Sequence, residues 1–188
     1  MTSLVLGLFL FLGIHLVPAT PALRGGVVAR LGENRYKAIF SLISFVGLAL
    51  IIVGYVTSDR GPQLFTPMPW ARALAPYAVT VSFILLAAAN MRGYIRKGLQ
   101  HPMLLGVLLW AGTHFLANGS LRASVFFGAF FAYAVVDLIS AIGRHAVKSF
   151  VASAKFDVIA VVAGIALALA VMVLHRVLFG VRVVTFGL

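Results

Sequence analysis

Long runs of residues without charge set the strongest limit on how this chain folds. The clearest run extends from Ala38 to Ser58 and holds 21 residues with no charged side chain. About 20 apolar residues in a helix are enough to cross the hydrocarbon core of a bilayer, where every backbone polar group must be satisfied within the chain. The run therefore predicts a transmembrane helix.

Other apolar runs have the same character, so we expect an all-α, polytopic integral membrane helical bundle of about six transmembrane helices. The predicted helices are Ser3 to about Val17, Ala38–Ser58, Ala73–Met91, Pro102–Asn118, Ala123 to about Ile142, and Val158 to about Leu174. Pro18 and Pro21 are expected to end the first helix, and Arg24 to Lys37 to form the connection after it. Neither a repeat nor a second domain is visible, so residues 1–188 are expected to form one domain.

Two local patterns predict how these helices pack and turn. Within the second predicted helix, small residues at helical spacing favour close contact with a neighbouring helix. They are Ser41, Ser44, Gly47 and Gly54. The dipeptide Asn118-Gly119 predicts a turn at the end of the fourth helix.

Composition separates membrane lipid from nucleic acid as the partner. Hydrophobic residues make up 62% of the chain and charged residues 10%, whereas a soluble domain has about 25% charged residues. The net charge of +11 would suit nucleic acid only on a soluble face. Because the charges lie in short segments between apolar runs, we expect contact with lipid and none with nucleic acid. The chain has no cysteine, which excludes disulfides, thiolate haem ligation and cysteine-based zinc or iron–sulfur sites.

The distribution of Lys and Arg predicts the orientation in the membrane, because cytoplasmic connections carry an excess of both. The first, third and fifth connections hold Arg24, Arg30, Arg35, Lys37, Arg92, Arg96, Lys97, Arg144, Lys148 and Lys155. The opposite side holds only Arg60, Arg72, Arg122, Arg176 and Arg182. Both termini are therefore expected outside the cytoplasm.

Two histidines stand out because each lies in a predicted helix with apolar residues on both sides. An imidazole in hydrocarbon is costly and marks a candidate site; the alternative for His15 and His114 is a hydrogen-bonded core histidine. Zinc would need three or four ligands, and no cysteines, HExxH motif or inward carboxylate pair accompany these two. Two imidazoles across an apolar slot are what a six-coordinate haem b iron requires. His101, just before Pro102, either begins its helix or faces a site.

Cations for the haem propionates follow His15 closely, at Arg24, Arg30, Arg35 and Lys37, since arginine and lysine form strong charge-assisted bonds to carboxylates. One geometric objection remains. Counted along their helices at 1.5 Å per residue, the depths of His15 and His114 differ by about 10 Å in a core of roughly 30 Å. A tilted haem or a first helix that begins below the surface would absorb this difference. Otherwise His101 is the alternative partner of His15.

Asp137 is the only acid well inside a predicted span. Two interpretations stay open for it. It is either a proton carrier or partner of a buried cation, or an acid near a helix end that reaches interfacial water or Arg144.

Residues spread over most of the chain carry a family resemblance. They are His15, Leu23-Arg24, Gly32-Glu33, Tyr36 to Phe40, Gly61, Gln63, Leu64 and the block His101-Pro102-Met103 with Gly106, Trp110 and His114. With these residues the chain resembles the NnrU family of bacterial membrane proteins and, more distantly, zeta-carotene isomerase of plants and cyanobacteria. The match is good up to about residue 130. The His-Pro pair is also similar to isoprenylcysteine methyltransferases, a function we rank last.

The resemblance implies a haem b in the bacterial inner (cell) membrane, with iron ligands at His15 and His114 and cofactor contacts at Arg24, Arg35, Lys37, Trp110 and His101. It implies a redox or accessory role in nitrite and nitric oxide metabolism (denitrification), with a redox partner. The alternative is a haem-dependent cis–trans isomerase of an apolar polyene such as zeta-carotene, or of a quinone-like lipid. In the isomerase a cysteine is thought to replace one histidine on reduction. Ala111 at that position favours the non-catalytic role, and whether the chain is an enzyme stays open.

Overall fold

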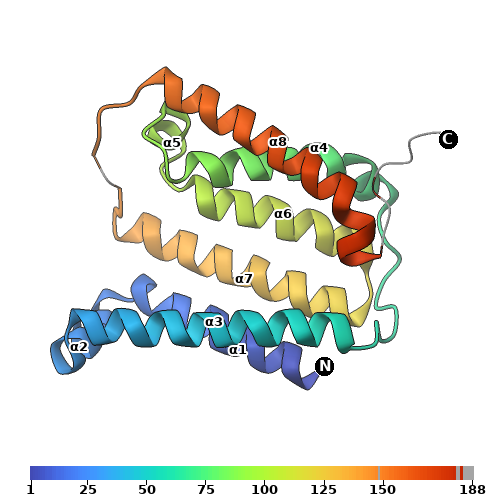
Figure 1. The fold of residues 1–188 in the computed structure, drawn as a ribbon, viewed down its shortest axis with the longest axis horizontal. Helices are drawn as coiled ribbons and strands as arrows, with labels where there is room; N and C mark the ends of the chain where they lie inside the picture. Colours follow the sequence, from blue (N-terminus) through green and yellow to red (C-terminus); the bar gives the residue numbers. More distant parts are fainter. Residues whose placement is uncertain (148, 181–182, 184–188) are drawn as a thin grey trace. The chain divides into compact units, whose positions relative to one another are not determined.

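A computed structural model describes the chain except for residues 148, 181–182 and 184–188 (Figure 1). Lys148 and Arg182, both used to predict the orientation, therefore lie outside the described residues. In the described part the regular structure is helical, apart from one isolated bridge between Gln63 and Ser120. The helices are α1 (Thr2–Ala19), α2 (Pro21–Leu31), α3 (Glu33–Thr57), α4 (Pro69–Ala88), α5 (Tyr94–Leu99), α6 (Pro102–Asn118), α7 (Leu121–Gly143) and α8 (Ala154–Phe179).

The helices belong to two compact units, which are interleaved along the chain. The first unit comprises Met1–Thr66 and Asn118–Arg144, with α1, α2, α3 and α7. The second comprises Pro67–Ala117 and His145–Leu188, with α4, α5, α6 and α8. Each unit is described by itself below. The single domain over residues 1–188 stays a prediction.

Five of the described helices are long and apolar enough to cross a membrane, namely α1, α3, α4, α7 and α8. The apolar helix α6 has 17 residues, or about 25 Å at 1.5 Å per residue, slightly less than a hydrocarbon core of roughly 30 Å. Large apolar side chains are exposed along the spans, as at Phe9 and Phe45. The predicted class, an all-α polytopic membrane protein in contact with lipid, is confirmed.

The first connection differs from the prediction. Pro18 lies inside α1, which continues to Ala19, because a proline in the last turn removes only one helical hydrogen bond. The expected loop from Arg24 to Lys37 is mostly helical. Pro21 occupies the first turn of α2, where its missing N–H is not needed. The break comes at Gly32, whose φ of +80° suits glycine.

Other boundaries shift by a few residues. The third predicted span begins earlier, as α4 at Pro69, and the last extends over Ala154–Phe179. A short helix, α5, lies in the third predicted connection. The turn at Asn118-Gly119 is confirmed, because Gly119 has a φ of +72° and its carbonyl accepts from the Leu64 N–H at 2.8 Å.

Small residues let α1 and α3 touch backbone to backbone in the first unit. A Cβ added at Gly7 would lie 2.6 Å from the Ile51 nitrogen, and one added at Gly54 would lie 2.6 Å from the Leu4 Cα. The predicted close-packing face of α3 is thus confirmed at its two glycines, Gly47 and Gly54, which both lie against α1. Next to the contact, Leu4, Leu8, Leu12 and Ile51 form the buried core.

In the second unit, α8 packs closely on α4, since a Cβ at Gly164 would lie 2.6 Å from the Ile84 nitrogen. The Ser82 hydroxyl of α4 donates to the Gly106 carbonyl of α6 at 2.6 Å. Asp157 in the first turn of α8 accepts from the N–H groups of Tyr94 and Ile95 at 2.8 and 2.9 Å. These contacts attach α5 to α8 and α6 to α4.

Candidate functional site

His15 is held in one orientation by its own helix. Its Nδ1 lies 2.6 Å from the Phe11 carbonyl oxygen, one turn earlier on α1. Because a carbonyl only accepts, this bond requires the proton on Nδ1, and Nε2 then carries the lone pair. A metal-binding histidine characteristically uses one ring nitrogen for such a bond and the other for the metal.

Aromatic rings surround His15 within the first unit. The ring centroid lies 4.3 Å from that of Phe11, 5.1 Å from Phe40 and 6.4 Å from Tyr133, with the last two nearly edge-on. These rings come from α1, α3 and α7. They make the surroundings of the imidazole apolar, as expected for the environment of a macrocycle.

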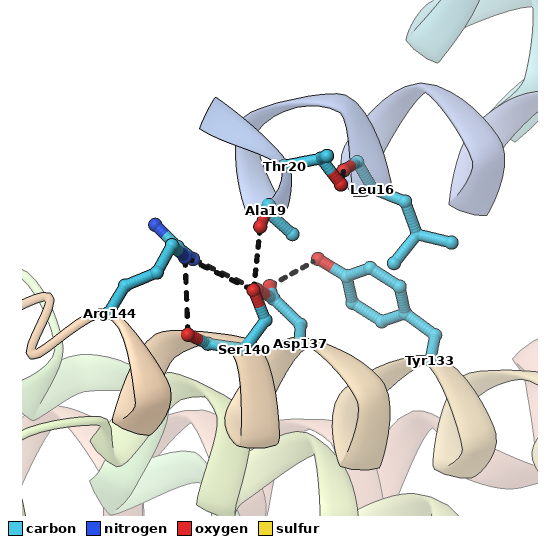
Figure 2. Close-up of polar contacts among 7 residues, drawn as sticks. All are labelled: Leu16, Ala19, Thr20, Tyr133, Asp137, Ser140 and Arg144. Atoms are coloured by element: carbon cyan, nitrogen blue, oxygen red, sulfur yellow. Dashed lines mark hydrogen bonds and ion pairs between the residues drawn. The ribbon is translucent and has the colours of Figure 1, made fainter. Parts of the chain in front are cut away.

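A polar cluster on α7 adjoins this aromatic group through Tyr133 (Figure 2). The Tyr133 hydroxyl donates to Asp137 Oδ2 at 3.0 Å, and Arg144 lies 3.9 Å from Asp137 Oδ1. The Ser140 hydroxyl donates to the Ala19 carbonyl at 2.6 Å and thereby caps the end of α1. The Asp137 side chain is 16% exposed. Of the two interpretations left open by the sequence, the contact with Arg144 near the helix end agrees with the second.

The cations predicted to bind propionates lie beside a carboxylate. Arg24 donates to both oxygens of Glu33 at 2.8 and 3.1 Å, and Lys37 lies 3.4 Å from the same side chain. The Arg24 guanidinium also lies over the Tyr36 ring, 5.4 Å from its centroid. Arg35 is exposed. Glu33 therefore neutralises part of the charge that the sequence assigned to the propionates.

His114 repeats the local arrangement of His15 in the second unit. Its Nδ1 lies 2.8 Å from the Trp110 carbonyl oxygen, again one turn earlier in the helix. The Trp110 and His114 ring centroids are 5.6 Å apart. Ala111, one residue after Trp110, is fully buried. The backbone bond again fixes the tautomer with the lone pair on Nε2.

His101 has a different environment, at the start of α6. Its Nε2 is buried and has no hydrogen-bond partner among the described residues. Among the described residues, no backbone carbonyl accepts a bond from its ring comparable to those at His15 and His114. The local geometry therefore favours His114 over His101 as a ligand.

The structure groups the predicted residues by unit. His15 lies with Arg24, Arg35 and Lys37 in the first unit, and His101, Trp110 and His114 lie in the second. Among the described residues, no cluster of three or more His, Cys, Asp or Glu side chains is placed to hold a metal ion. A haem iron does not need such a cluster, because the porphyrin supplies four of its six ligands.

One contact was missed by the sequence reasoning. Arg122, counted only for orientation, donates to the carbonyls of Tyr55 and Ser58 at 2.9 and 2.5 Å and so caps α3. This contact has no sequence signal, because it joins residues more than 60 positions apart.

Comparison with known proteins identifies the family. The model of the family described as NnrU protein matches residues 3–183, nearly the whole chain. No curated protein and no solved structure matches the chain.

Proposed function

The chain belongs to the NnrU family, and we propose that it binds one haem b within the membrane, whose iron His15 and His114 would ligate. The observation that carries the proposal is the same bond at both histidines. Each Nδ1 lies against the carbonyl four residues earlier, at 2.6 and 2.8 Å. This bond turns both imidazoles into oriented bases with an acceptor Nε2, the form that binds iron.

The other residues of the chain serve this cofactor by position and charge. Phe11, Phe40 and Trp110 supply apolar rings beside the two imidazoles and keep water away from them. The exposed Arg35 would hold a propionate, whereas Arg24 and Lys37 both lie beside Glu33. Bound in this way, the haem supplies a one-electron redox centre.

We further propose a redox or accessory role in nitrite and nitric oxide metabolism, which membership of the NnrU family and the proposed pair of imidazole ligands support. A haem with two fixed imidazoles has no open position, which suits electron transfer with a redox partner better than catalysis on a substrate. The isomerase alternative needs a second ligand near His114, and the buried Ala111 methyl offers no ligating atom. We place the protein in the bacterial inner membrane with both termini on the periplasmic side.

Optical spectra of the purified full-length protein test the proposal. Protein expressed with ample haem is expected to show a low-spin Soret band when oxidised and a sharp α band after reduction with dithionite. Protein without a Soret band under these conditions would refute haem binding.

Four single variants then identify the ligands. His15→Ala and His114→Ala are expected to give a high-spin spectrum or lose the haem, because each removes one axial nitrogen. His101→Ala and His175→Ala are the matched controls from the second unit and are expected to stay low-spin. A low-spin spectrum that survives in His114→Ala and is lost in His101→Ala would move the ligand to His101.

Carbon monoxide separates the redox role from catalysis at the iron. The reduced wild-type protein is expected to bind carbon monoxide slowly, because both axial positions are filled. The reduced His114→Ala variant is expected to bind it at once. Rapid binding by the wild type would indicate an exchangeable ligand and favour the isomerase alternative.

A further inference from the structure

A cavity of about 440 Å³ lies in the second unit, away from His114 and at the opposite end of α6. Its walls come from the end of α4, from α5, from the start of α6 and from residues 146, 147, 149 and 150 before α8. The volume falls in the range of small-ligand sites, about 300–1,000 Å³. None of the contacts described above for His15 or His114 involves it.

The polar wall of the cavity is basic. Arg96 and Lys97 line it, and none of the described lining residues is an acid. The Arg96 guanidinium lies over the Phe150 ring, 5.2 Å from its centroid, and is thereby held at the wall. The nearby acid of α8, Asp157, uses its two oxygens on the backbone N–H groups of Tyr94 and Ile95. The two cations therefore face the cavity without a carboxylate beside them.

His101 adds a hydrogen-bonding group to the same wall. It lines the cavity, and its buried Nε2 has no partner among the described residues. The ring is placed by a tight turn in which the His101 N–H donates to the Leu99 carbonyl at 2.6 Å and Gln100 has a φ of +61°. Residues other than glycine rarely adopt this conformation, and such strained turns occur preferentially at ligand sites.

Another part of the lining is apolar and includes the first residues of the apolar helix α6. Pro102, Met103, Leu104 and Phe150 line it, and Met103 is 49% exposed. Because α4 ends and α6 begins here, the cavity lies where apolar helices give way to charged connections. In a bilayer this is the level of the lipid headgroups.

We propose that this cavity binds the phosphate of an anionic phospholipid, with Arg96, Lys97 and His101 around the headgroup and Met103 and Phe150 beside the first part of the acyl chains. Arginine and lysine form strong charge-assisted bonds to phosphate. Basic pockets beside transmembrane helices are known to bind anionic headgroups. This site is independent of the haem proposal, because its residues do not ligate the iron there.

Native mass spectrometry of the full-length protein in detergent tests the site. The probes are dioleoylphosphatidylglycerol, dioleoylphosphatidylcholine and inorganic phosphate, each added alone. One phosphatidylglycerol per protein is expected to bind, with the zwitterionic lipid and free phosphate at least tenfold weaker. Equal binding of phosphatidylcholine would refute the role of the two cations. Free phosphate that binds as tightly as the lipid would refute the role of the apolar wall.

Variants link that binding to the cavity. Each cation near an anionic lipid contributes a factor of about five in affinity. The double variant Arg96→Gln/Lys97→Gln is therefore expected to bind phosphatidylglycerol about thirtyfold more weakly, and Lys97→Gln alone about fivefold. Lys97 is exposed, so the single variant keeps the test valid if loss of the Arg96–Phe150 contact prevents folding.

The matched control is Arg30→Gln/Lys155→Gln, which removes the same charge from connections assigned to the same side of the membrane. Neither residue lines the cavity, so this control is expected to bind phosphatidylglycerol within about twofold of the wild type. If Lys97→Gln and the cavity double variant bind it as tightly as the control, the site assignment is wrong.

Discussion

Gly47 offers the sharpest test of how the first unit positions His15. A Cβ added at Gly47 of α3 would lie 2.7 Å from the Phe11 nitrogen and 3.0 Å from the Phe11 Cα of α1. Phe11 is the residue whose carbonyl bonds His15 Nδ1. The change Gly47→Ala should therefore push α1 away from α3 at the turn that orients the imidazole.

The expected magnitude follows from two opposing effects. Ordinary van der Waals contact begins at 3.4 Å, so the Phe11 backbone must recede by about 0.7 Å, and overpacking of this kind costs about 1–3 kcal/mol. Alanine is a better helix former than glycine by about 1 kcal/mol. The net loss of stability for Gly47→Ala is then between about 0 and 2 kcal/mol.

Gly13→Ala is the matched control, because it places the same methyl group on α1 where no neighbouring atom lies within 4 Å. Gly13→Ala should gain stability from the higher helix propensity of alanine without overpacking against a neighbouring helix. The two variants should differ by about 1–3 kcal/mol in the free energy of unfolding, the size of the overpacking cost. Reversible unfolding of the full-length protein in SDS, followed by circular dichroism, measures the difference. Equal stability of the two variants would refute the backbone-to-backbone contact between α1 and α3.

Three further outcomes are expected. Asp137→Leu should lower the free energy of unfolding by about 1–3 kcal/mol in the same assay, because it leaves the Tyr133 hydroxyl without its acceptor. Asp137→Asn keeps an acceptor and should lower it less. Equal decreases for the two variants would contradict this account. Asp157→Ala should lower the free energy of unfolding by about 1–2 kcal/mol, since it removes the cap of α5. It should leave the haem spectrum unchanged. An altered Soret band would contradict the separation of the proposed haem site from the region around α5. A reporter active only in the periplasm should be active when fused after residue 188, and activity of a cytoplasmic reporter there would refute the predicted orientation.

Hydropathy predicted the membrane helices because a span needs a long uncharged run, and such runs are visible without any tertiary information. Boundaries were less predictable where polar residues join a helix. Gly25, Gly26 and the arginines around them suggested a loop, yet they form α2. Pro21 was the available signal, since a proline in the first turn of a helix is common. Only the backbone geometry at Gly32 reveals that one helix ends and the next begins there.

The candidate site residues were chosen from the sequence, and they stay a prediction, whereas their charge pairing could not be predicted. Apolar neighbours in sequence were sufficient to select His15 and His114. The pairing of Arg24 with Glu33 depends on how α2 turns into α3, and it redirects a cation that the sequence assigned to the propionates. The cavity beside His101 could not be predicted from the sequence. Its lining combines residues of α5 with Phe150, which follows α5 by about fifty residues.

A shared spacing connects the two histidines and was already present in the sequence. Each follows an aromatic residue by four positions, Phe11 before His15 and Trp110 before His114. In a helix this spacing stacks the two side chains on one face and places the aromatic residue's carbonyl beneath the imidazole. That carbonyl has a second lone pair for Nδ1 beyond its helical bond. The aromatic ring limits the rotation of the imidazole while the carbonyl fixes its tautomer. The residue four positions before His101 is Lys97, which is not aromatic. This difference is the physical reason to expect iron at His114 rather than at His101.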